Sequence, residues 1–207
     1  MYRIITVERE YGSGAAAIAG QLAARLGWKL WDRELTAEIA RMANVSPSAV
    51  SFCEERVHST FQRLVKVFWR GSYERSMQVE HLTFDPDRMV KVGEQVMHTI
   101  AEQGKSIIVG RGAPYFLRER SDTFHVFLYA PRAEKLRRIQ KLGKSLGDAE
   151  DLVDTVDRER SLFIKHYFHA DWPTRSLYHL MINTAIGDEN VVSVILHSMG
   201  MLEGRPV

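Results

Sequence analysis

A glycine-containing turn near the start of the chain has the residue types and spacing of a phosphate-binding loop. The largely β-branched, apolar segment 3–7 leads into the turn EYGSG, in which Gly12 and Gly14 can adopt backbone angles that other residues avoid. A helical pattern starts directly afterwards, with apolar residues recurring along one face from Ile18 onwards. Backbone N–H groups at such a helix start attract anions. We therefore predict that Gly12, Ser13 and Gly14 hold the phosphates of a ligand.

The turn departs from the Walker A pattern, in which a Lys and a Ser or Thr after the second glycine hold the phosphates and magnesium. When Gly14 is taken as that glycine, Arg9 stands in the place of the first glycine, and Ala15 and Ala16 stand in the places of Lys and Ser/Thr. Arg9 either supplies the missing positive charge from the other side of the phosphate or points outwards. Ser13 carries the only hydroxyl among the small residues of the turn, and it suits a helix cap as well as a magnesium ligand.

A second candidate site follows the apolar segment 106–109, where Arg111 stands between two glycines. Ligands of open α/β sheets gather at the carboxyl ends of the strands, and a guanidinium group binds a phosphate through two parallel hydrogen bonds. We predict that Arg111 binds an anionic group of the substrate; the alternative is a surface arginine in a tight turn. Asp32 ends another strand pattern, 29–31, and either works in the same site or caps the next helix.

Positive charge is concentrated in the segment 132–144. It holds six basic residues and one acidic residue, although the whole chain has a formal net charge of only +2. This distribution favours a small anionic ligand and gives no general case for a nucleic-acid polymer. Within the segment we expect Lys135, Lys141 and Lys144 to be exposed surface charges.

The elements that must position these residues alternate along the chain. Strand patterns at 4–7, 29–31, 106–109, 123–129 and 179–182 are separated by helical patterns, which predicts an α/β protein with a parallel sheet between helices. The 207 residues suffice for one domain, 1–207. Residues 44–86 break the rhythm with a helical pattern. They form either a ligand-binding insertion or a surface packed on the core or on a second subunit, as in a homodimer.

Composition excludes several other classes of protein. Cys53 is the only cysteine, so no intrachain disulfide forms, and no Cys/His spacing is typical of zinc. No apolar run approaches the ~20 residues of a membrane span. The first strand pattern begins at Tyr2, which leaves no room for a signal peptide. We expect a cytoplasmic protein without a membrane partner.

Four stretches of the chain resemble the cytidylate-kinase-like family. They are ITVEREYGSG, IAGQLAARLGWKLWDREL, IIVGRGAPYFL and DRERSLFIKHYFHADWPTRSLYHLMINT. The resemblance runs from the N-terminus to Asn183 and is loose between Asn44 and Pro86. It implies a P-loop-kinase-like fold of about five strands in the order 2-3-1-4-5. It also implies phosphoryl transfer from ATP, with Mg²⁺, to a nucleoside monophosphate, with CMP as the expected acceptor.

The resemblance also implies roles for single residues. Arg111 holds the acceptor's phosphate, and Asp32 lies near the acceptor and the transferring phosphate. Arg158 and Arg160 stand in the family's Asp-Arg-x-Arg segment and close over the transferring group, as part of a lid-like segment at 131–172. Asp32 could orient a hydroxyl or hold magnesium through water, and residues 44–86 correspond to an acceptor-binding insertion of such kinases.

Two further hypotheses stay open at this point. Because Ala15 and Ala16 replace the Walker side chains, the chain could be a non-catalytic nucleotide-binding sensor or scaffold that keeps the fold. It could also be a kinase for another small acceptor. Formation of ADP from ATP in the presence of nucleoside monophosphates separates the enzyme from the sensor.

Overall fold

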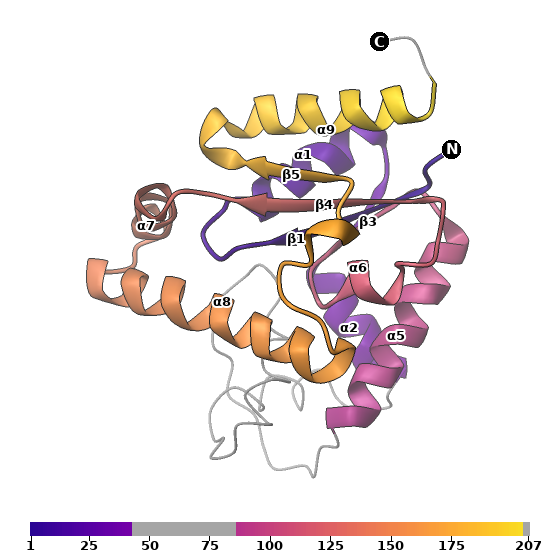
Figure 1. Ribbon diagram of the computed structural model, residues 1–207, viewed down its shortest axis with the longest axis horizontal. Coiled ribbons are helices and arrows are strands. Elements are labelled where there is room, and N and C mark those ends of the chain that lie inside the picture. The colour runs from indigo at the N-terminus through magenta and orange to yellow at the C-terminus, as the bar shows by residue number, and fades with distance from the viewer. Residues whose placement is uncertain (43–85, 205–207) are drawn as a thin grey trace.

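A five-stranded parallel sheet forms the centre of the computed structural model, which describes residues 1–42 and 86–204. The strands lie in the order β2-β3-β1-β4-β5, which confirms the predicted order (Figure 1). Their bounds are β1 (Ile4–Arg9), β2 (Lys29–Trp31), β3 (Ser106–Val109), β4 (Thr123–Tyr129) and β5 (Leu180–Asn183). The predicted segments agree to within two residues at each end. The longest extension, of β1 from Val7 to Arg9, moves two charged residues into the sheet.

The central strands are apolar runs because both faces of the sheet are covered. All residues of β1 and β3 are buried, as is typical of parallel strands between two helical layers. Successive side chains of β1 point to opposite faces. Ile5 and Val7 join one core cluster, and Ile4 joins the other.

Helices cover the two faces unequally (Figure 1). α1 (Ala15–Leu26) and α9 (Asp188–Leu202) pack side by side on one face, where Ile18, Leu22 and Ile195 contribute to the core. The other face carries α2 (Arg33–Met42), α5 (Pro86–Gln103), α6 (Ala113–Phe116) and α8 (Leu146–Phe168). Leu35 and Phe163 are buried there. α7 (Arg132–Lys141) lies beyond the carboxyl ends of the strands and packs on α8.

The starts of three helices are well defined. α2 begins at Arg33, directly after Asp32, and α5 begins at Pro86. Gly187 is the N-cap of α9, with a φ of 97° outside the helical region, and Asp188 is the first helical residue. Two short 3₁₀ turns, Arg175–Leu177 and Thr184–Ile186, flank β5.

Two regions of the sequence analysis need a separate statement. The predicted insertion at 44–86, with its possible contact to a second subunit, lies outside the described residues except for Pro86. Among the helices that the structure describes, none is long and apolar enough to cross a membrane.

Candidate active site

The predicted phosphate loop connects β1 to α1 and is built around two glycines. Gly12 and Gly14 have φ values of 77° and 83°, in the left-handed region that favours glycine. Gly14 is the N-cap of α1, so the first amide groups of that helix, which have no partner within it, face the turn. A Cβ atom at Gly14 would lie 1.6 Å from Nη1 of Arg138. Glycine is therefore required at position 14 by backbone conformation and by the close approach of α7.

Side chains from α7 and α8 hold the backbone of this loop. Nη1 of Arg160 donates to the carbonyl oxygen of Arg9 at 2.9 Å, and Oδ1 of Asp157 accepts from the backbone N–H of Tyr11 at 2.7 Å. Nζ of Lys135 lies 2.5 Å from a carboxylate oxygen of Glu10. Burial raises the pKa of the Asp157 carboxyl, and the charges of Arg160 and Lys135 oppose that rise. The loop is thus fixed at several points by charged groups outside it.

The expectation that Lys135 is an exposed surface charge is wrong. Its side chain is 10% exposed and pairs with Glu10 and Asp157. The helix α7 packs so closely on the loop that a Cβ atom at Gly12 would lie 3.0 Å from Cβ of Lys135. One face of α7 is therefore an interior face, while Lys141 and Lys144 are exposed as predicted.

Ser13 is a buried residue of the loop, and its side chain does not cap α1. The residue is 1% exposed, and α1 has no side-chain capping hydrogen bond. Within the described part of the chain, its Oγ has no hydrogen-bond partner. A buried hydroxyl without a partner costs free energy, so this group suits a ligand that donates or accepts a hydrogen bond at the loop.

A pocket beside the loop gathers three buried arginines, which we call the arginine pocket. Arg9, Arg111 and Arg160 are 5%, 4% and 8% exposed. The pocket is lined by Glu8, Arg9, Arg111, Gly112, Arg160, Phe163, Ile164 and Trp172. The lining thus holds three guanidinium groups and a single carboxylate. Such a surplus of buried positive charge suits an anionic ligand.

Arg9 points into this pocket and not outwards. A Cβ atom at Gly110 would lie 1.6 Å from Nη1 of Arg9, so the guanidinium group of Arg9 rests on the backbone of the turn that carries Arg111. Nη1 of Arg9 is 3.4 Å from Oε1 of Glu8, a long ion pair. Arg9 therefore brings positive charge to the Gly-Arg-Gly turn.

Arg111 and Asp32 meet at the carboxyl ends of β3 and β2. The guanidinium group of Arg111 donates to the backbone carbonyl of Asp32 and to the hydroxyl of Thr36. Burial, together with the charge of Arg9, lowers the pKa of Arg111 to about 10, while the charges of Asp32 and Glu34 oppose the shift. The group is still protonated at neutral pH. Arg111 itself has a φ of 55°, and conformations of this kind cluster at functional sites.

Arg160 and Arg158 leave α8 in different directions. Arg160 lines the pocket, and its pKa falls to about 10 because of burial and then because of the nearby charge of Arg9. Arg158 is exposed. Two residues along an α-helix are about 200° apart around its axis, so the packing of α8 brings Arg160 to the pocket and leaves Arg158 on the solvent side.

Several residues around the site were missed by sequence reasoning. Glu8 and Trp172 line the pocket, and Asp157 and Arg138 hold the loop. In the described part of the chain, Nε1 of Trp172 is a buried donor without a partner. Asp157 is the first residue of the Asp-Arg-x-Arg segment, so that motif could have pointed to it. No local signal distinguishes Arg138 from its neighbour Arg137.

The arrangement of sheet, glycine loop and arginine pocket is that of a P-loop-kinase-like protein. Solved structures with this fold support the classification. The chain is similar to an uncharacterized protein from Eubacterium ventriosum, with 18% identity, a TM-score of 0.64, and coverage of 94% of this chain and 96% of that chain. It is also similar to shikimate kinase from Bacteroides thetaiotaomicron, with 15% identity, a TM-score of 0.53, and coverage of 97% and 98%. At these identities the likeness shows the fold alone.

Sequence relatives indicate the family to which the chain belongs within this class of fold. A cytidylate kinase from Methanosarcina mazei is 28% identical over 125 residues, which are 58% of this chain and 69% of the relative. A cytidylate kinase from Methanosarcina acetivorans is 25% identical over 125 residues, which are again 58% of this chain and 69% of the relative. The model of the Cytidylate kinase-like family matches residues 4–186. The chain belongs to this family, and membership supports nucleotide kinase activity with nucleotides as small-molecule partners.

The family and the fold imply ATP and typically Mg²⁺ as cofactors. The loop fits the phosphates of ATP, because Gly14 begins α1, whose first amide groups have no partner within the helix, and Ser13 offers a buried hydroxyl without a partner in the described chain. Among residues 1–42 and 86–204 there is no group of three His, Cys, Asp or Glu side chains that could hold a metal ion. In nucleotide-binding sites, magnesium is commonly held by one or two carboxylates together with substrate phosphates and water.

Proposed function

We propose that this protein transfers a phosphoryl group from ATP to a nucleoside monophosphate, with CMP as the acceptor. The observation that carries the proposal is the convergence of Arg9, Arg111 and Arg160 in one pocket beside the glycine loop. Enzymes of this class work mainly by positioning the phosphates and stabilising the charge that develops on the equatorial oxygens. Several guanidinium groups around one small space meet that need.

The proposal gives the two sides of the site different tasks. Gly12, Ser13 and Gly14 hold the donor phosphates through backbone amides and the buried hydroxyl. Arg111 holds the acceptor's phosphate, and Asp32 fixes Arg111 through its backbone carbonyl. ATP, when bound, would supply the γ-phosphoryl group, which passes to an acceptor oxygen as its bond to the β-phosphate breaks.

The remaining pocket residues stabilise charge and exclude water. Arg9 and Arg160 face the same space from the end of β1 and from α8, where they stabilise the transferring group. Phe163, Ile164 and Trp172 form the apolar part of the lining, which strengthens electrostatic interactions by keeping water out. We include residues 131–172 as a lid-like segment of one kinase-like domain, 1–207. The side chain of Arg158 is exposed and does not line the pocket, so the proposal places Arg160 of this motif at the transferring group.

CMP is favoured over other acceptors by the sequence relatives. The two Methanosarcina proteins are named cytidylate kinases, and the family description has the same word. Their identity of 25–28% supports the reaction class more firmly than the base. A kinase for another small acceptor therefore remains the first outcome to test beside CMP.

One observation favours a non-catalytic nucleotide-binding protein as the second candidate. Ala15 and Ala16 begin α1, so the loop has no lysine ammonium and no hydroxyl at the positions where Walker A proteins use them. Loss of one preorganised donor can cost ~10²- to 10³-fold in rate. In this alternative the protein binds ATP and signals its presence without turnover.

The deciding experiment measures ADP formation with ATP, Mg²⁺ and a panel of CMP, dCMP, UMP, AMP and GMP. We expect turnover with a cytidine monophosphate at a rate above the ATPase background, together with the matching diphosphate as product. Shikimate and simple sugars serve as other small acceptors in the same assay. ATP binding by calorimetry without ADP formation from any acceptor would contradict the enzyme and favour the sensor.

A further inference from the structure

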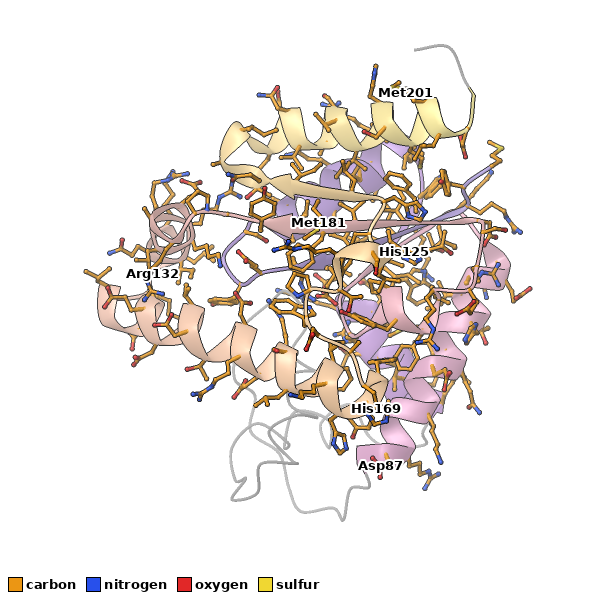
Figure 2. All side chains as sticks on the ribbon, in the orientation of Figure 1. Asp87, His125, Arg132, His169, Met181 and Met201 are labelled. Carbon is orange, nitrogen blue, oxygen red and sulfur yellow. The ribbon has the colours of Figure 1, made fainter. Side chains whose placement is uncertain are left out.

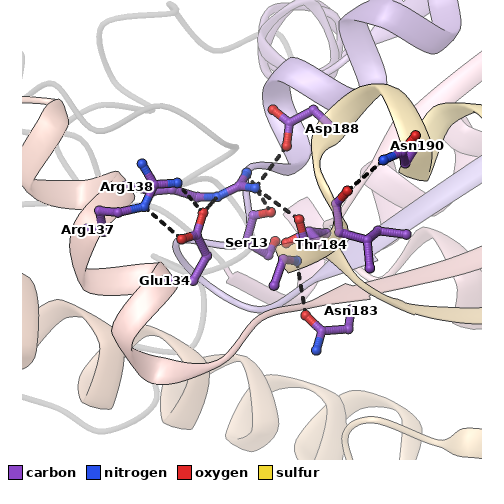
Figure 3. A network of polar contacts seen from close by, with 10 residues as sticks. Ser13, Glu134, Arg137, Arg138, Asn183, Thr184, Asp188 and Asn190 are labelled. Atoms are coloured by element: carbon purple, nitrogen blue, oxygen red, sulfur yellow. Dashed lines mark hydrogen bonds and ion pairs between the residues drawn. The ribbon is translucent and has the colours of Figure 1, made fainter.

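Arg138 joins three segments that are far apart in the sequence (Figure 3). From α7, its Nη1 donates to the carbonyl oxygen of Ser13 in the phosphate loop at 3.2 Å. Its Nη2 donates to the carbonyl oxygen of Thr184 at 3.1 Å and lies 2.9 Å from Oδ1 of Asp188 at the start of α9. Its Nε donates to Oε1 of Glu134 at 2.7 Å. The side chain is 17% exposed, so these contacts lie in a partly buried joint.

The bond to Ser13 sets the direction of the next amide. In a trans peptide unit the carbonyl group and the following N–H point in opposite directions. When Arg138 holds the carbonyl of Ser13, the N–H of Gly14 must point away from α7. Gly14 is the N-cap of α1, where amide groups point out of the helix towards an anion. Arg138 therefore fixes the orientation of an amide that belongs to the phosphate loop.

The close approach at Gly14 has the same origin. A Cβ atom at this position would lie 1.6 Å from Nη1 and 2.8 Å from Cζ of Arg138. The guanidinium group can reach the loop carbonyl only because no side chain stands there. A glycine at position 14 thus permits both the positive φ of 83° and the contact with Arg138.

Charge balance indicates that Arg138 supports the loop and does not itself bind the phosphates. Its guanidinium group contacts two carboxylates, those of Glu134 and Asp188, in addition to two backbone carbonyls. These four contacts use donors on all three of its nitrogen atoms. Adjacent Arg137 is 51% exposed and pairs with Glu134 alone, so it shares the carboxylate without reaching the loop.

We propose that Arg138 is a positioning residue that holds the phosphate loop in its anion-binding form by fixing the Ser13–Gly14 peptide. It provides through backbone orientation part of what the absent Walker side chains would provide directly. The inference deepens the proposed function and rests on it in taking the donor phosphates as the ligand of the loop. It assigns Arg138 no contact with the reacting atoms.

The test compares Arg138→Ala with Arg138→Lys and with Arg137→Ala, the matched control. Affinity for ATP and for inorganic tripolyphosphate is measured by calorimetry, and KM for ATP and for the acceptor is measured separately. We expect Arg138→Ala to lose ~10-fold or more in affinity for both polyphosphates, with a higher KM for ATP and an unchanged KM for the acceptor. Arg138→Lys should recover part of the loss, and Arg137→Ala should stay within ~2-fold of wild type.

A second variant disrupts the same contact from the loop side, and a separate measurement checks that each variant is folded. Gly14→Ala places a methyl group where Nη1 of Arg138 lies, so it should displace the same contact. The effects of Gly14→Ala and Arg138→Ala on tripolyphosphate affinity should then be less than additive in the double variant. Thermal unfolding of each variant shows whether it is folded at the assay temperature.

The outcomes separate this inference from the proposed function. Wild type that binds tripolyphosphate but shows no turnover contradicts the kinase, while the difference between Arg138→Ala and Arg137→Ala still decides the role of Arg138. Equal affinities in these two variants would overturn the inference. Tighter binding by Arg138→Ala would also overturn it, because the side chain would then obstruct the loop. A wild type without affinity for either polyphosphate would remove the loop as an anion site and the inference with it.

Discussion

The phosphate loop and the arginine pocket lie side by side, but they differ in how many carboxylates lie beside their cations. The loop is braced by two cations of α7, each of which contacts two carboxylates. These contacts join Lys135 to Glu10 and Asp157, and Arg138 to Glu134 and Asp188. The arginine pocket is lined by three cations and the single carboxylate of Glu8.

The difference suggests a division between cations that brace the loop and cations that we propose bind ligands, with Arg160 contributing to both because it also holds the carbonyl of Arg9. A buried cation between two carboxylates is stabilised by the protein alone, and removal of a partner would leave a costly unpaired charge. In the pocket, burial and the charge of Arg9 lower the pKa of both Arg111 and Arg160 to about 10. Arg9 repels both groups, while Asp157 pairs with Arg160, and Asp32 and Glu34 offset part of the repulsion at Arg111. The free energy that an anion gains in this pocket is the physical basis of the proposed site.

The largest expected effect comes from Arg111, on the pocket side of the comparison. Arg111→Ala should lower kcat/KM for the acceptor by ~10²- to 10³-fold, or about 3 to 4 kcal/mol, because the buried cation that holds the acceptor's phosphate is lost. Affinity for ATP should change by less than ~3-fold, since the loop contacts remain. Steady-state kinetics with calorimetry on ATP checks both.

Arg118→Ala is the matched control for this variant, because Arg118 is 55% exposed and pairs with Glu119, which is 88% exposed. It should behave as wild type. Equal weakening of ATP and acceptor by Arg111→Ala would remove the division of the site into a donor loop and an acceptor pocket.

The fold was predictable from the sequence because a strand that is buried on both faces of the sheet is a nearly continuous apolar run in the sequence. The apolar runs 4–7 and 106–109 are buried strands of one parallel sheet, as predicted. The strand order came from the resemblance to a family, since periodicity alone does not order parallel strands. The Gly-Arg-Gly turn was visible for a similar reason, because glycines on both sides of Arg111 are a local signal for an unusual backbone.

The environments of the α7 and α8 side chains were not predictable, because they depend on how each helix is rotated about its axis. Arg137 and Arg138 are adjacent and identical, yet their side chains are 51% and 17% exposed. Lys135 was taken for a surface residue and lies against the loop. Arg158 and Arg160 differ in the same way. Only the packing of the two helices on the loop decides which charges face inwards.

One dependence of stability on pH should come from a histidine in the sheet. His125 on β4 is 3% exposed, and its Nδ1 lies 2.7 Å from the hydroxyl of Thr6 on β1 (Figure 2 shows His125 among the strands). Burial, with a smaller contribution from the neighbouring His179, lowers its pKa from 6.5 to about 4. Between these values the unfolded chain binds more protons than the folded chain, so stability is complete above about pH 6.5 and falls towards pH 4.

The expected loss from this one histidine is at most about 3 kcal/mol. His125→Gln should flatten the dependence of the free energy of unfolding on pH, measured by urea titration between pH 4 and 7. His197→Gln is the control, because His197 is exposed on α9. An unchanged slope in His125→Gln would assign the acid sensitivity to other groups.

Asp157 contacts both the loop and a cation of the arginine pocket, so its substitution should affect the ligands of both regions. The carboxylate accepts from the N–H of Tyr11 and pairs with Lys135 and Arg160. Asp157→Asn keeps the shape but loses the charge, so it should weaken both ATP and the acceptor by ~10-fold. Asp154→Asn, one turn earlier on α8 and 62% exposed, should change neither by more than ~2-fold. An effect confined to one ligand would show that loop and pocket are set independently.

The smallest expected effect sharpens the comparison most, because it sets two arginines of one motif against each other. Arg160 faces the pocket and holds the carbonyl of Arg9, whereas Arg158 is exposed. Arg158→Ala should therefore change kcat by less than ~2-fold, as expected for an exposed charge. Arg160→Ala should lower kcat by ~10²-fold, since it removes a cation from a desolvated site. Both variants are compared at saturating ATP and acceptor. A loss in Arg158→Ala as large as that in Arg160→Ala would mean that α8 rotates or closes when substrates bind. The exposed side of that helix would then belong to the site.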